Sequence, residues 1–195
     1  MEDLLKDRFL LTKEHFSEEA KLSYDPSGDN IIGKVDGWEA VENNVIAFFF
    51  GAGWCPACQQ FTPLLKDLYR ELDERQAPFQ VIFISFDKRP EDMEKYYMEE
   101  QGDWLAVPFG DPLIDELKKL FNISAVPKLI IVKDDGDIIT TKGRKEVQDK
   151  GIICFRNWQS VAGIKDGQKK KVLFKMRDEQ IETESNKTDN ISDNS

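Results

Sequence analysis

The sequence has little of what a disulfide scaffold, a membrane protein or a nucleic-acid-binding protein needs. Its 195 residues include three cysteines, an odd number and too few for a disulfide framework. The longest apolar run, residues 45–50, is far shorter than the stretch of about 20 residues that crosses a bilayer. Lysine and arginine total 27 against 37 acidic residues, which gives a net charge of −10. We therefore expect neither nucleic acid nor an anionic membrane as a partner, because both need clustered positive charge.

The N-terminus also lacks the basic start and apolar run of a secretory signal, because Met1–Lys6 is acidic and polar at once. Intracellular compartments keep cysteines reduced except when they react. We therefore expect a soluble intracellular protein, in the cytoplasm or also in the nucleus, that works as a monomer. Its three thiols then indicate redox chemistry or metal binding rather than structural bridges.

Apolar patterning predicts an α/β fold in a single domain. Five runs rich in apolar residues have the length of strands. They are residues 9–12, 45–50, 79–86, 129–132 and 138–141. The last two are joined by the turn-forming residues Asp134–Asp137, which predict a hairpin. Residues 23–37 are rich in turn-forming residues and predict a loop.

Helices are predicted between and after these strands. Apolar residues at three-and-four spacing begin at Cys58 and continue to Leu72. Pro90 and Pro112 each open a further helix. The expected apolar faces of the last two helices comprise Leu113, Ile114, Leu117, Leu120 and Phe121, and then Ile153, Phe155, Trp158, Val161 and Ala162. Strands that alternate with helices imply a central mixed sheet flanked by helices on both faces.

The composition changes beyond about residue 175. Residues 178–195 contain six acidic residues, one lysine and almost no apolar residues. Such a stretch cannot bury enough apolar surface to offset the entropy lost on folding. We expect one folded domain over residues 1–170 and a charged, disordered tail over residues 171–195.

The motif that carries chemistry is Gly53–Cys58, in which two residues separate Cys55 from Cys58. It lies directly between a predicted buried strand and an amphipathic helix, so the Cys55 sulfur is expected at a helix N-terminus that favours a thiolate. The thiolate is the nucleophile of thiol–disulfide exchange. Cys55 is therefore expected to attack a partner's disulfide, and Cys58 to resolve the mixed disulfide. Pro56 suits the first helical turn, and Trp54 offers a flat contact surface beside the sulfur.

Two alternative roles for the cysteines are open besides exchange. They could be inert half-buried thiols, although inertness does not account for the strand–tryptophan–dithiol–helix context. A structural zinc site needs four ligands, and Cys55, Cys58, Cys154 and His15 come from unrelated segments without a second paired motif. We expect no metal and no other cofactor. Cys154 is expected to be a buried core thiol, with a redox-sensing thiol as the alternative.

The residues around the dithiol resemble the thioredoxin superfamily. The resemblance is carried by Trp54–Cys58 at a strand–helix junction, by Pro63 five residues after the second cysteine, and by Val126–Pro127 before a strand. More specifically, residues 1–164 resemble the nucleoredoxin and tryparedoxin branch. The segments that carry this closer likeness are Phe61–Leu65, Val81–Asp87, Trp104–Phe109, Asp111–Pro112, Val126–Lys133, Gly143–Lys145 and Gly151–Trp158.

The resemblance implies a thioredoxin-like fold and a protein dithiol–disulfide oxidoreductase of redox homeostasis or signalling. It implies a cis Val126–Pro127 peptide that faces the dithiol, with the Val126 backbone binding an incoming extended chain. From the residues alone, Pro127 could equally be a trans proline at the start of a strand. Trp54, Pro56, Val126 and Pro127 are then the substrate-binding residues. The implied partners are protein disulfides and an upstream reductant, which is a thioredoxin, glutathione or a reductase.

Two departures from the family pattern bear on function. Thioredoxins usually bury an acid six residues before the first cysteine to accept the proton of the resolving thiol, and here Phe49 occupies that position. Some nucleoredoxin-like proteins lack one cysteine of the pair and are associated with the survival of sensory neurons, including photoreceptors. The resemblance therefore leaves a second function open, that of a non-catalytic or redox-regulated binding protein that supports photoreceptor and olfactory neurons. This chain retains both cysteines, which favours an enzyme.

Overall fold

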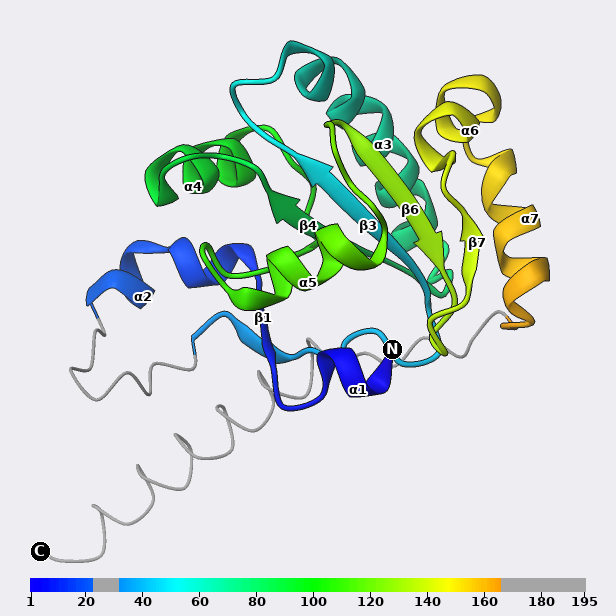
Figure 1. Cartoon of the computed structure of the whole chain (residues 1–195), viewed down its shortest axis with the longest axis horizontal. Helices are drawn as coiled ribbons and strands as arrows, with labels where there is room; N and C mark the ends of the chain where they lie inside the picture. Colours follow the sequence, from blue (N-terminus) through cyan, green and yellow to red (C-terminus); the bar gives the residue numbers. More distant parts are fainter. Residues whose placement is uncertain (23–31, 166–195) are drawn as a thin grey trace, which may run out of the picture.

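The computed structural model describes residues 1–22 and 32–165, and within them seven strands form one mixed sheet (Figure 1). The strands are β1 (Phe9–Leu11), β2 (Lys34–Asp36), β3 (Val45–Gly51), β4 (Phe79–Ser85), β5 (Leu105–Ala106), β6 (Lys128–Val132) and β7 (Ile138–Thr140). Their order across the sheet is β2–β1–β5–β4–β3–β6–β7. β3, β4 and β5 are mutually parallel, and the other neighbours are antiparallel. The five predicted strands are confirmed.

Helices cover both faces of this sheet. They are α1 (Glu2–Leu5), the 3-10 helix η1 (Lys13–Phe16), α2 (Glu18–Leu22), α3 (Pro56–Glu74), α4 (Pro90–Glu99), α5 (Pro112–Leu120), α6 (Gly143–Lys150) and α7 (Ile153–Ala162). Side chains of α3, α4, α6 and α7 share one apolar core with one face of the sheet. Side chains of α1 and α5 share a second core with the other face. The predicted α/β architecture, a mixed sheet flanked on both faces in a single domain, is confirmed.

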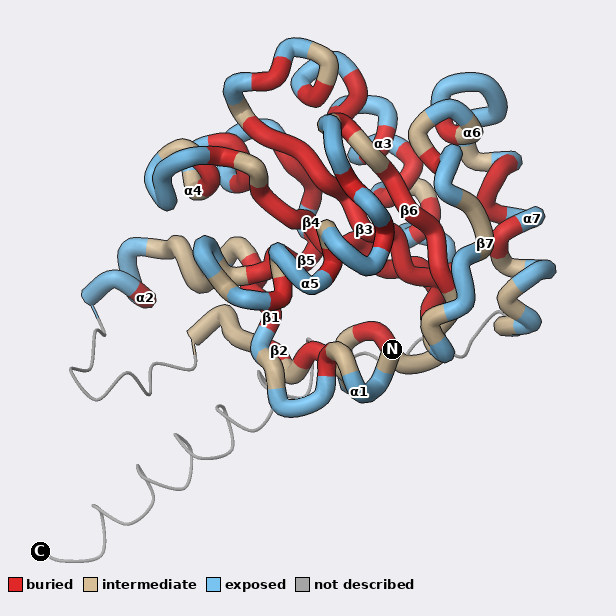
Figure 2. Tube along the Cα trace, in the orientation of Figure 1, coloured by how far each residue is buried: buried red, intermediate tan, exposed pale blue. Residues whose placement is uncertain are grey.

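The central strands are apolar throughout because both of their faces are buried. Every residue of β3 and β4 is buried, as Figure 2 shows for the middle of the sheet. Successive side chains of a strand point to opposite faces, so Phe49 enters the core under α3 whereas Phe48 and Phe50 enter the core under α5. A continuous apolar run is therefore needed, which is the pattern typical of buried parallel strands.

Three helices begin as their sequences predict, each with a proline in its first turn. Pro56 opens α3, Pro90 opens α4 and Pro112 opens α5. Proline costs little there because its missing N–H would have no helical partner. At α5 the Asp111 carboxylate caps the helix by accepting the Leu113 N–H at 2.8 Å.

Two details of the prediction are wrong. The expected loop over residues 23–37 contains β2, which pairs with β1. Leu120, Ile153 and Val161, expected on buried helix faces, are exposed. Ile153 lies about 140° around α7 from the buried Trp158. Leu120 and Val161 lie in the last turn of their helices. The spacing of apolar residues predicts the direction of each side chain, but it does not predict whether the sheet extends far enough to cover it.

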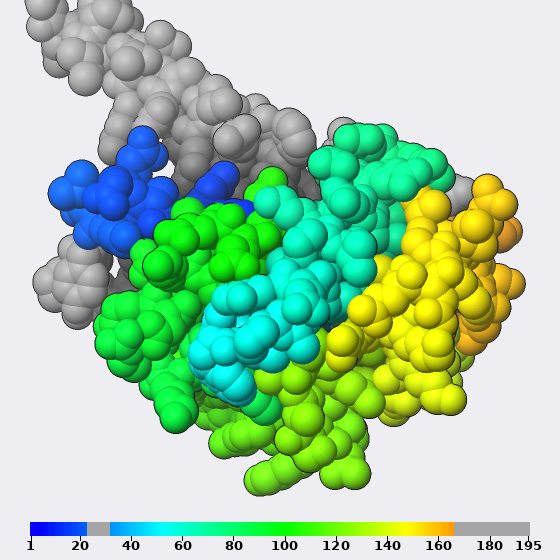
Figure 3. All heavy atoms as spheres, turned by 90° about the horizontal axis from the view of Figure 1, so that it is seen from above, coloured from blue at the N-terminus to red at the C-terminus, as the bar shows by residue number. Residues whose placement is uncertain are grey.

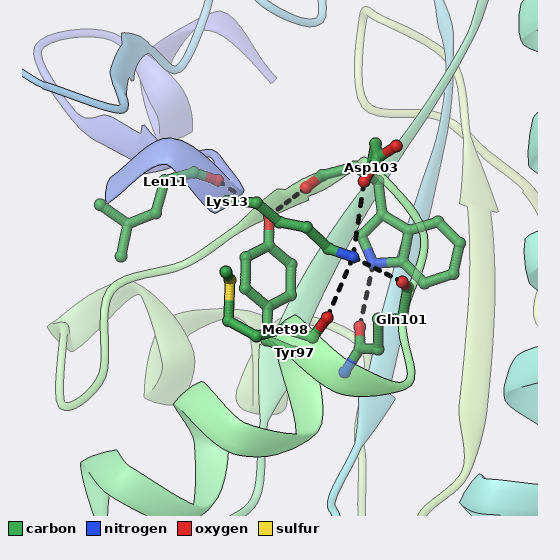
Figure 4. Close-up of polar contacts among 7 residues, drawn as sticks. Leu11, Lys13, Tyr97, Met98, Gln101 and Asp103 are labelled. Atoms are coloured by element: carbon green, nitrogen blue, oxygen red, sulfur yellow. Dashed lines mark hydrogen bonds and ion pairs between the residues drawn. The ribbon is translucent and has the colours of Figure 1, made fainter. Parts of the chain in front are cut away.

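The N-terminal segment is fastened to the end of α4 by a polar cluster (Figure 4). The Lys13 ammonium donates to the Gln101 carbonyl at 2.8 Å and pairs with Asp103 at 3.4 Å. The buried Tyr97 hydroxyl donates to the Leu11 carbonyl at 3.3 Å and also contacts the Trp104 carbonyl. These contacts hold β1 against α4 and β5, so the N-terminal segment extends the sheet.

Parts of the chain organisation lie beyond what the structure describes. The expected tail over residues 171–195 and the last residues of the domain expected over 1–170 lie outside the described residues. Residues 23–31 of the expected loop do so too. Among the helices in the described ranges, none has both the length and the apolar character needed to cross a bilayer.

Candidate dithiol site

Cys55 caps the N-terminus of α3, where the chain leaves the central strand β3. Its backbone is extended, with φ −95° and ψ 109°, and α3 begins at the next residue, Pro56. The Cys55 sulfur accepts the backbone N–H of Cys58 at 3.2 Å. The sulfur thus faces the free amides of the helix start, where negative charge is favoured. This is the position that the sequence predicts for it.

The two thiols differ in access and in acidity. Both are free, and Cys55 keeps 6% of its surface exposed whereas Cys58 keeps none. Burial raises the pKa of Cys58 to about 12, helped by its hydrogen bond with Cys55 and opposed by the Ala52 backbone and the Arg144 cation. Cys55 is therefore the sulfur that a partner can reach, and Cys58 is a protonated thiol held behind it.

The loop that precedes Cys55 is held by a buried carboxylate. The Gly53 N–H donates to Asp87 Oδ1 at 3.0 Å, and the Ser85 hydroxyl donates to Asp87 Oδ2 at 2.8 Å. On the other side, the Gln59 side-chain amide donates to the Gly53 carbonyl at 2.7 Å. A side chain at residue 53 would be crowded, because a Cβ there would lie 3.1 Å from Cβ of Tyr96. Asp87 was not among the predicted site residues, and its one signal in the sequence was an acid directly after a buried strand.

Trp54 forms an exposed flat surface beside the dithiol. Its side chain is 60% exposed, and its indole N–H donates to the Phe86 carbonyl at 3.2 Å. The hydrogen bond fixes the ring over the end of β4 while leaving an aromatic face to solvent. Pro56, on the other side of Cys55, is also exposed.

The Val126–Pro127 peptide is cis, as the resemblance implies, and it faces Cys55. The Cys55 thiol donates to the Val126 carbonyl across 3.8 Å. Val126 is half-buried and Pro127 is buried. The structure thus brings together Cys55, Cys58, Trp54, Pro56 and the Val126–Pro127 peptide, which sequence reasoning placed in one site.

The loop before α3, which follows the end of β3, lies on one face of the molecule (Figure 3). In that view the loop before α3, in cyan, lies between the green segment that contains α4 and the yellow segment that contains α6. The yellow-green segment below it leads into β6. Four separate parts of the chain therefore meet around the dithiol.

A hydroxyl chain supports the first turn of α3 from below. The Thr62 hydroxyl donates to the Cys58 carbonyl at 2.9 Å, and the Thr62 and Tyr96 hydroxyls lie 2.6 Å apart in a hydrogen bond. Both side chains are buried, and burial raises the pKa of Tyr96 above its usual value. Tyr96 is therefore neutral and donates to Thr62, which in turn donates to Cys58.

Thr62→Val should destabilise the protein more than Tyr96→Phe. The valine leaves the buried Tyr96 hydroxyl without a partner, at a cost of about 1–3 kcal/mol, whereas the phenylalanine removes only one bond of about 1 kcal/mol. The double variant should cost less than the sum, because no unpaired hydroxyl then remains. Urea unfolding of the three variants measures this, and strictly additive free energies of unfolding would contradict the described chain.

Position 49 holds an aromatic side chain in a dry core. Phe49 is fully buried, and its ring packs against those of Phe61, Phe83 and Trp104. The proton acceptor of thioredoxins is therefore replaced by a hydrocarbon surface.

Cys154 is a buried core thiol, as predicted, and burial raises its pKa to about 12. In the described ranges, no three side chains of His, Cys, Asp and Glu gather as metal ligands would.

A dithiol that opens a helix at the end of a central strand, opposite a cis proline, defines the thioredoxin-like class of proteins. Comparison with known proteins agrees with this class. A family described as thioredoxin-like matches residues 43–138. The thioredoxin of Wuchereria bancrofti is 34% identical, with a TM-score of 0.62, and the match covers 81% of this chain and 98% of that one. The chain belongs to the thioredoxin-like family.

Within this family the similar proteins are nucleoredoxins and tryparedoxins. Nucleoredoxin-like protein 1 of Homo sapiens is 36% identical over 131 residues, which are 65% of this chain and 62% of that protein. The tryparedoxin of Trypanosoma brucei is 31% identical with a TM-score of 0.57, over 65% of this chain and 86% of that one. The chain spans 60% to 63% of the length of the nucleoredoxin-like relatives from human, mouse and Xenopus laevis. These relatives support its placement in the nucleoredoxin branch.

Proposed function

We propose that this chain is a thiol–disulfide oxidoreductase that reduces protein disulfides through Cys55 and Cys58. The observation that carries the proposal is the Cys55 sulfur at the start of α3, 3.2 Å from the Cys58 N–H and facing the Val126 carbonyl. The Cys55 thiolate attacks one sulfur of the substrate disulfide, and the displaced substrate thiolate takes up a proton. Cys58 then loses its proton and attacks the Cys55 sulfur. This closes the Cys55–Cys58 disulfide and releases the second substrate thiol.

The substrate chain is proposed to bind along the exposed rim of the dithiol. Trp54 and Pro56 offer apolar surface on one side of Cys55, and Val126 offers backbone groups on the other. An extended segment can pair with the Val126 backbone as an added strand, while the buried Pro127 holds that backbone in place. No cofactor takes part.

An upstream thiol returns the protein to its reduced form. A thioredoxin, glutathione or a reductase can supply two electrons by the same exchange chemistry in reverse. One relative, tryparedoxin II, has been solved with glutathionylspermidine, which supports a glutathione-type donor among these three. The proposed setting is redox homeostasis or signalling in the cytoplasm, or also in the nucleus.

Within the nucleoredoxin branch, we propose that the chain is a counterpart of nucleoredoxin-like protein 2. The support is the likeness of Val126–Lys133, Gly143–Lys145 and Gly151–Trp158 to that protein. Gly143 has a structural reason to be fixed, because a Cβ there would lie 2.9 Å from the Leu129 carbonyl oxygen. The same proposal assigns to this chain the association with sensory-neuron survival that some nucleoredoxin-like proteins have.

Cys58→Ser should trap substrates as mixed disulfides. Cys55 still attacks, but no thiol remains to resolve the product, so a covalent adduct accumulates. The measurement incubates the reduced variant with insulin and follows a larger, dithiothreitol-sensitive species on a non-reducing gel. The control is the Cys55→Ser/Cys58→Ser double variant, which should form none. An adduct of equal yield in the control would assign the reactivity to Cys154 and reject the proposal.

A second candidate function is partner binding without turnover, and Phe49 favours it. A site without a buried proton acceptor is poorly suited to fast general reduction. A binding protein could still use the exposed Trp54 surface to engage a partner that supports photoreceptor and olfactory neurons. In that case the double cysteine-to-serine variant should sustain photoreceptors in culture as well as the unaltered chain does. Complete loss of that effect would reject the candidate.

A further inference from the structure

Arg144 is the second residue of α6. Figure 3 shows the yellow segment that contains α6 beside the cyan loop that contains Cys55. The helix start is fixed in place, because a Cβ on Gly143 would lie 2.9 Å from the Leu129 carbonyl oxygen. Leu129 is the register partner of Phe49 across β6 and β3. Arg144 therefore follows a tightly packed glycine next to the strand pair that carries residue 49.

The half-buried Arg144 side chain has one buried nitrogen, Nε, without a hydrogen-bond partner among the described residues. The ion pairs of the described residues do not include Arg144. A buried donor without an acceptor costs free energy, so native proteins rarely keep one without a reason. A negative group that forms during the reaction would supply that reason.

The negative group that can form here is the thiolate of Cys58. The titratable side chains that act on Cys58 come from three elements: Cys55 at the start of α3, Tyr96 from α4 and Arg144 from α6. Tyr96 stays neutral, because burial raises its pKa. A thiolate on Cys55 opposes a second negative charge, and Arg144 lowers the pKa of Cys58. Of the three, Arg144 alone carries a positive charge.

We propose that Arg144 is a positioning residue that stabilises the Cys58 thiolate during resolution of the mixed disulfide. It thereby takes over the task of the buried acid that Phe49 replaces. This inference rests on the proposed oxidoreductase function. An acid accepts the proton of the resolving thiol, whereas a cation lowers the free energy of the thiolate and leaves the proton to water. The thiolate then attacks the Cys55 sulfur, a Cys55–Cys58 bond forms, and the substrate thiolate leaves.

Arg144→Gln should slow resolution but not the first attack. The test mixes the reduced full-length protein with the uncharged disulfide 2,2′-dithiodipyridine in a stopped-flow instrument. The first release of 2-thiopyridone reports attack by Cys55, and the second reports resolution by Cys58. We expect the second release to slow about 10-fold at pH 7, because the Cys58 thiolate loses the positive charge that stabilises it. The first release should change less than about twofold.

Rescue by lysine separates this role from a merely structural one. Below its pKa the thiolate fraction of Cys58 rises tenfold per pH unit, so the second rate should rise with pH in both proteins. The Arg144→Gln profile should be displaced to higher pH, and Arg144→Lys should recover most of the lost rate because it restores the charge. A loss that lysine does not relieve would overturn the inference.

The matched control removes the next positive charge along α6. Lys145 is exposed and paired with Asp149, so Lys145→Gln should leave both releases unchanged. The Cys55→Ser variant measures the 2-thiopyridone released by Cys154, and this amount is subtracted from the other traces.

If the unaltered chain shows no first release, the proposed function fails. If its first release is normal and Arg144→Gln leaves the second unchanged, only the Arg144 inference fails. The experiment is repeated with the anionic disulfide 5,5′-dithiobis(2-nitrobenzoate). If Arg144→Gln then slows only the first release, Arg144 acts in substrate binding and the Arg144 inference is overturned.

Discussion

Replacement of Cys55 by serine should abolish reduction of a protein disulfide, with a loss of rate of at least about 10³-fold. A serine hydroxyl stays protonated near neutral pH and does not attack sulfur, and Cys58 cannot replace Cys55 because it is fully buried behind it. The measurement is the single-turnover rate at which reduced protein releases a fluorescent peptide from a disulfide-linked pair, without another reductant present.

The matched control for this experiment is Cys154→Ala. Cys154 lies in the core on α7, and burial raises its pKa to about 12. A thiol that is both sealed and protonated contributes nothing to exchange, so the variant should keep the rate of the unaltered protein within about twofold. A Cys55→Ser protein that retains most of the rate, or a Cys154→Ala protein that loses it, would contradict the assignment of the nucleophile.

Phe49→Asp should unfold much of the protein rather than restore the acid of thioredoxins. The substitution removes a ring that contacts Phe61, Phe83 and Trp104 and leaves a carboxyl group among them. Loss of a buried aromatic side chain costs about 3–5 kcal/mol, and burial of a polar group without a partner adds to this. Thermal unfolding should show a midpoint lowered by about 10 °C or more.

The control for this substitution is Phe49→Leu. Leucine keeps an apolar side chain at the site, so it should cost about 1–2 kcal/mol through imperfect packing alone. If the aspartate variant proved as stable as the leucine variant, the space around residue 49 would have to admit water or a compensating cation. The account of a dry aromatic core in place of a proton acceptor would then be wrong.

The parts of the fold that sequence reasoning predicted are those in which one local pattern suffices. β3 and β4 are buried on both faces, so their apolar runs identify them without knowledge of any neighbour. α6 was missed for the opposite reason. Its eight residues include only Gly143 and Val147 as buried positions, so no apolar periodicity marks it. β5 has two residues and forms only because β4 and β1 lie on either side.

The same distinction applies to the site. The dithiol, its helix and the Val126–Pro127 peptide belong to contiguous motifs, and the structure brings them together. Asp87 and Tyr96 support the dithiol loop from more than 30 residues away. Arg144 reaches the same region from α6, which sequence reasoning did not find. Such residues become part of a site only when the packing of separate elements is known.

In the proposed reaction, the exposed edge of Cys55 begins an exchange that ends in a Cys55–Cys58 disulfide. The most direct test lets the reduced protein react once with a protein disulfide, blocks the remaining thiols with an alkylating reagent and maps the peptides by mass spectrometry. We expect a disulfide between Cys55 and Cys58, with Cys154 alkylated only after unfolding. Recovery of free Cys55 and Cys58 after the substrate has been reduced, or of a disulfide that contains Cys154, would contradict it.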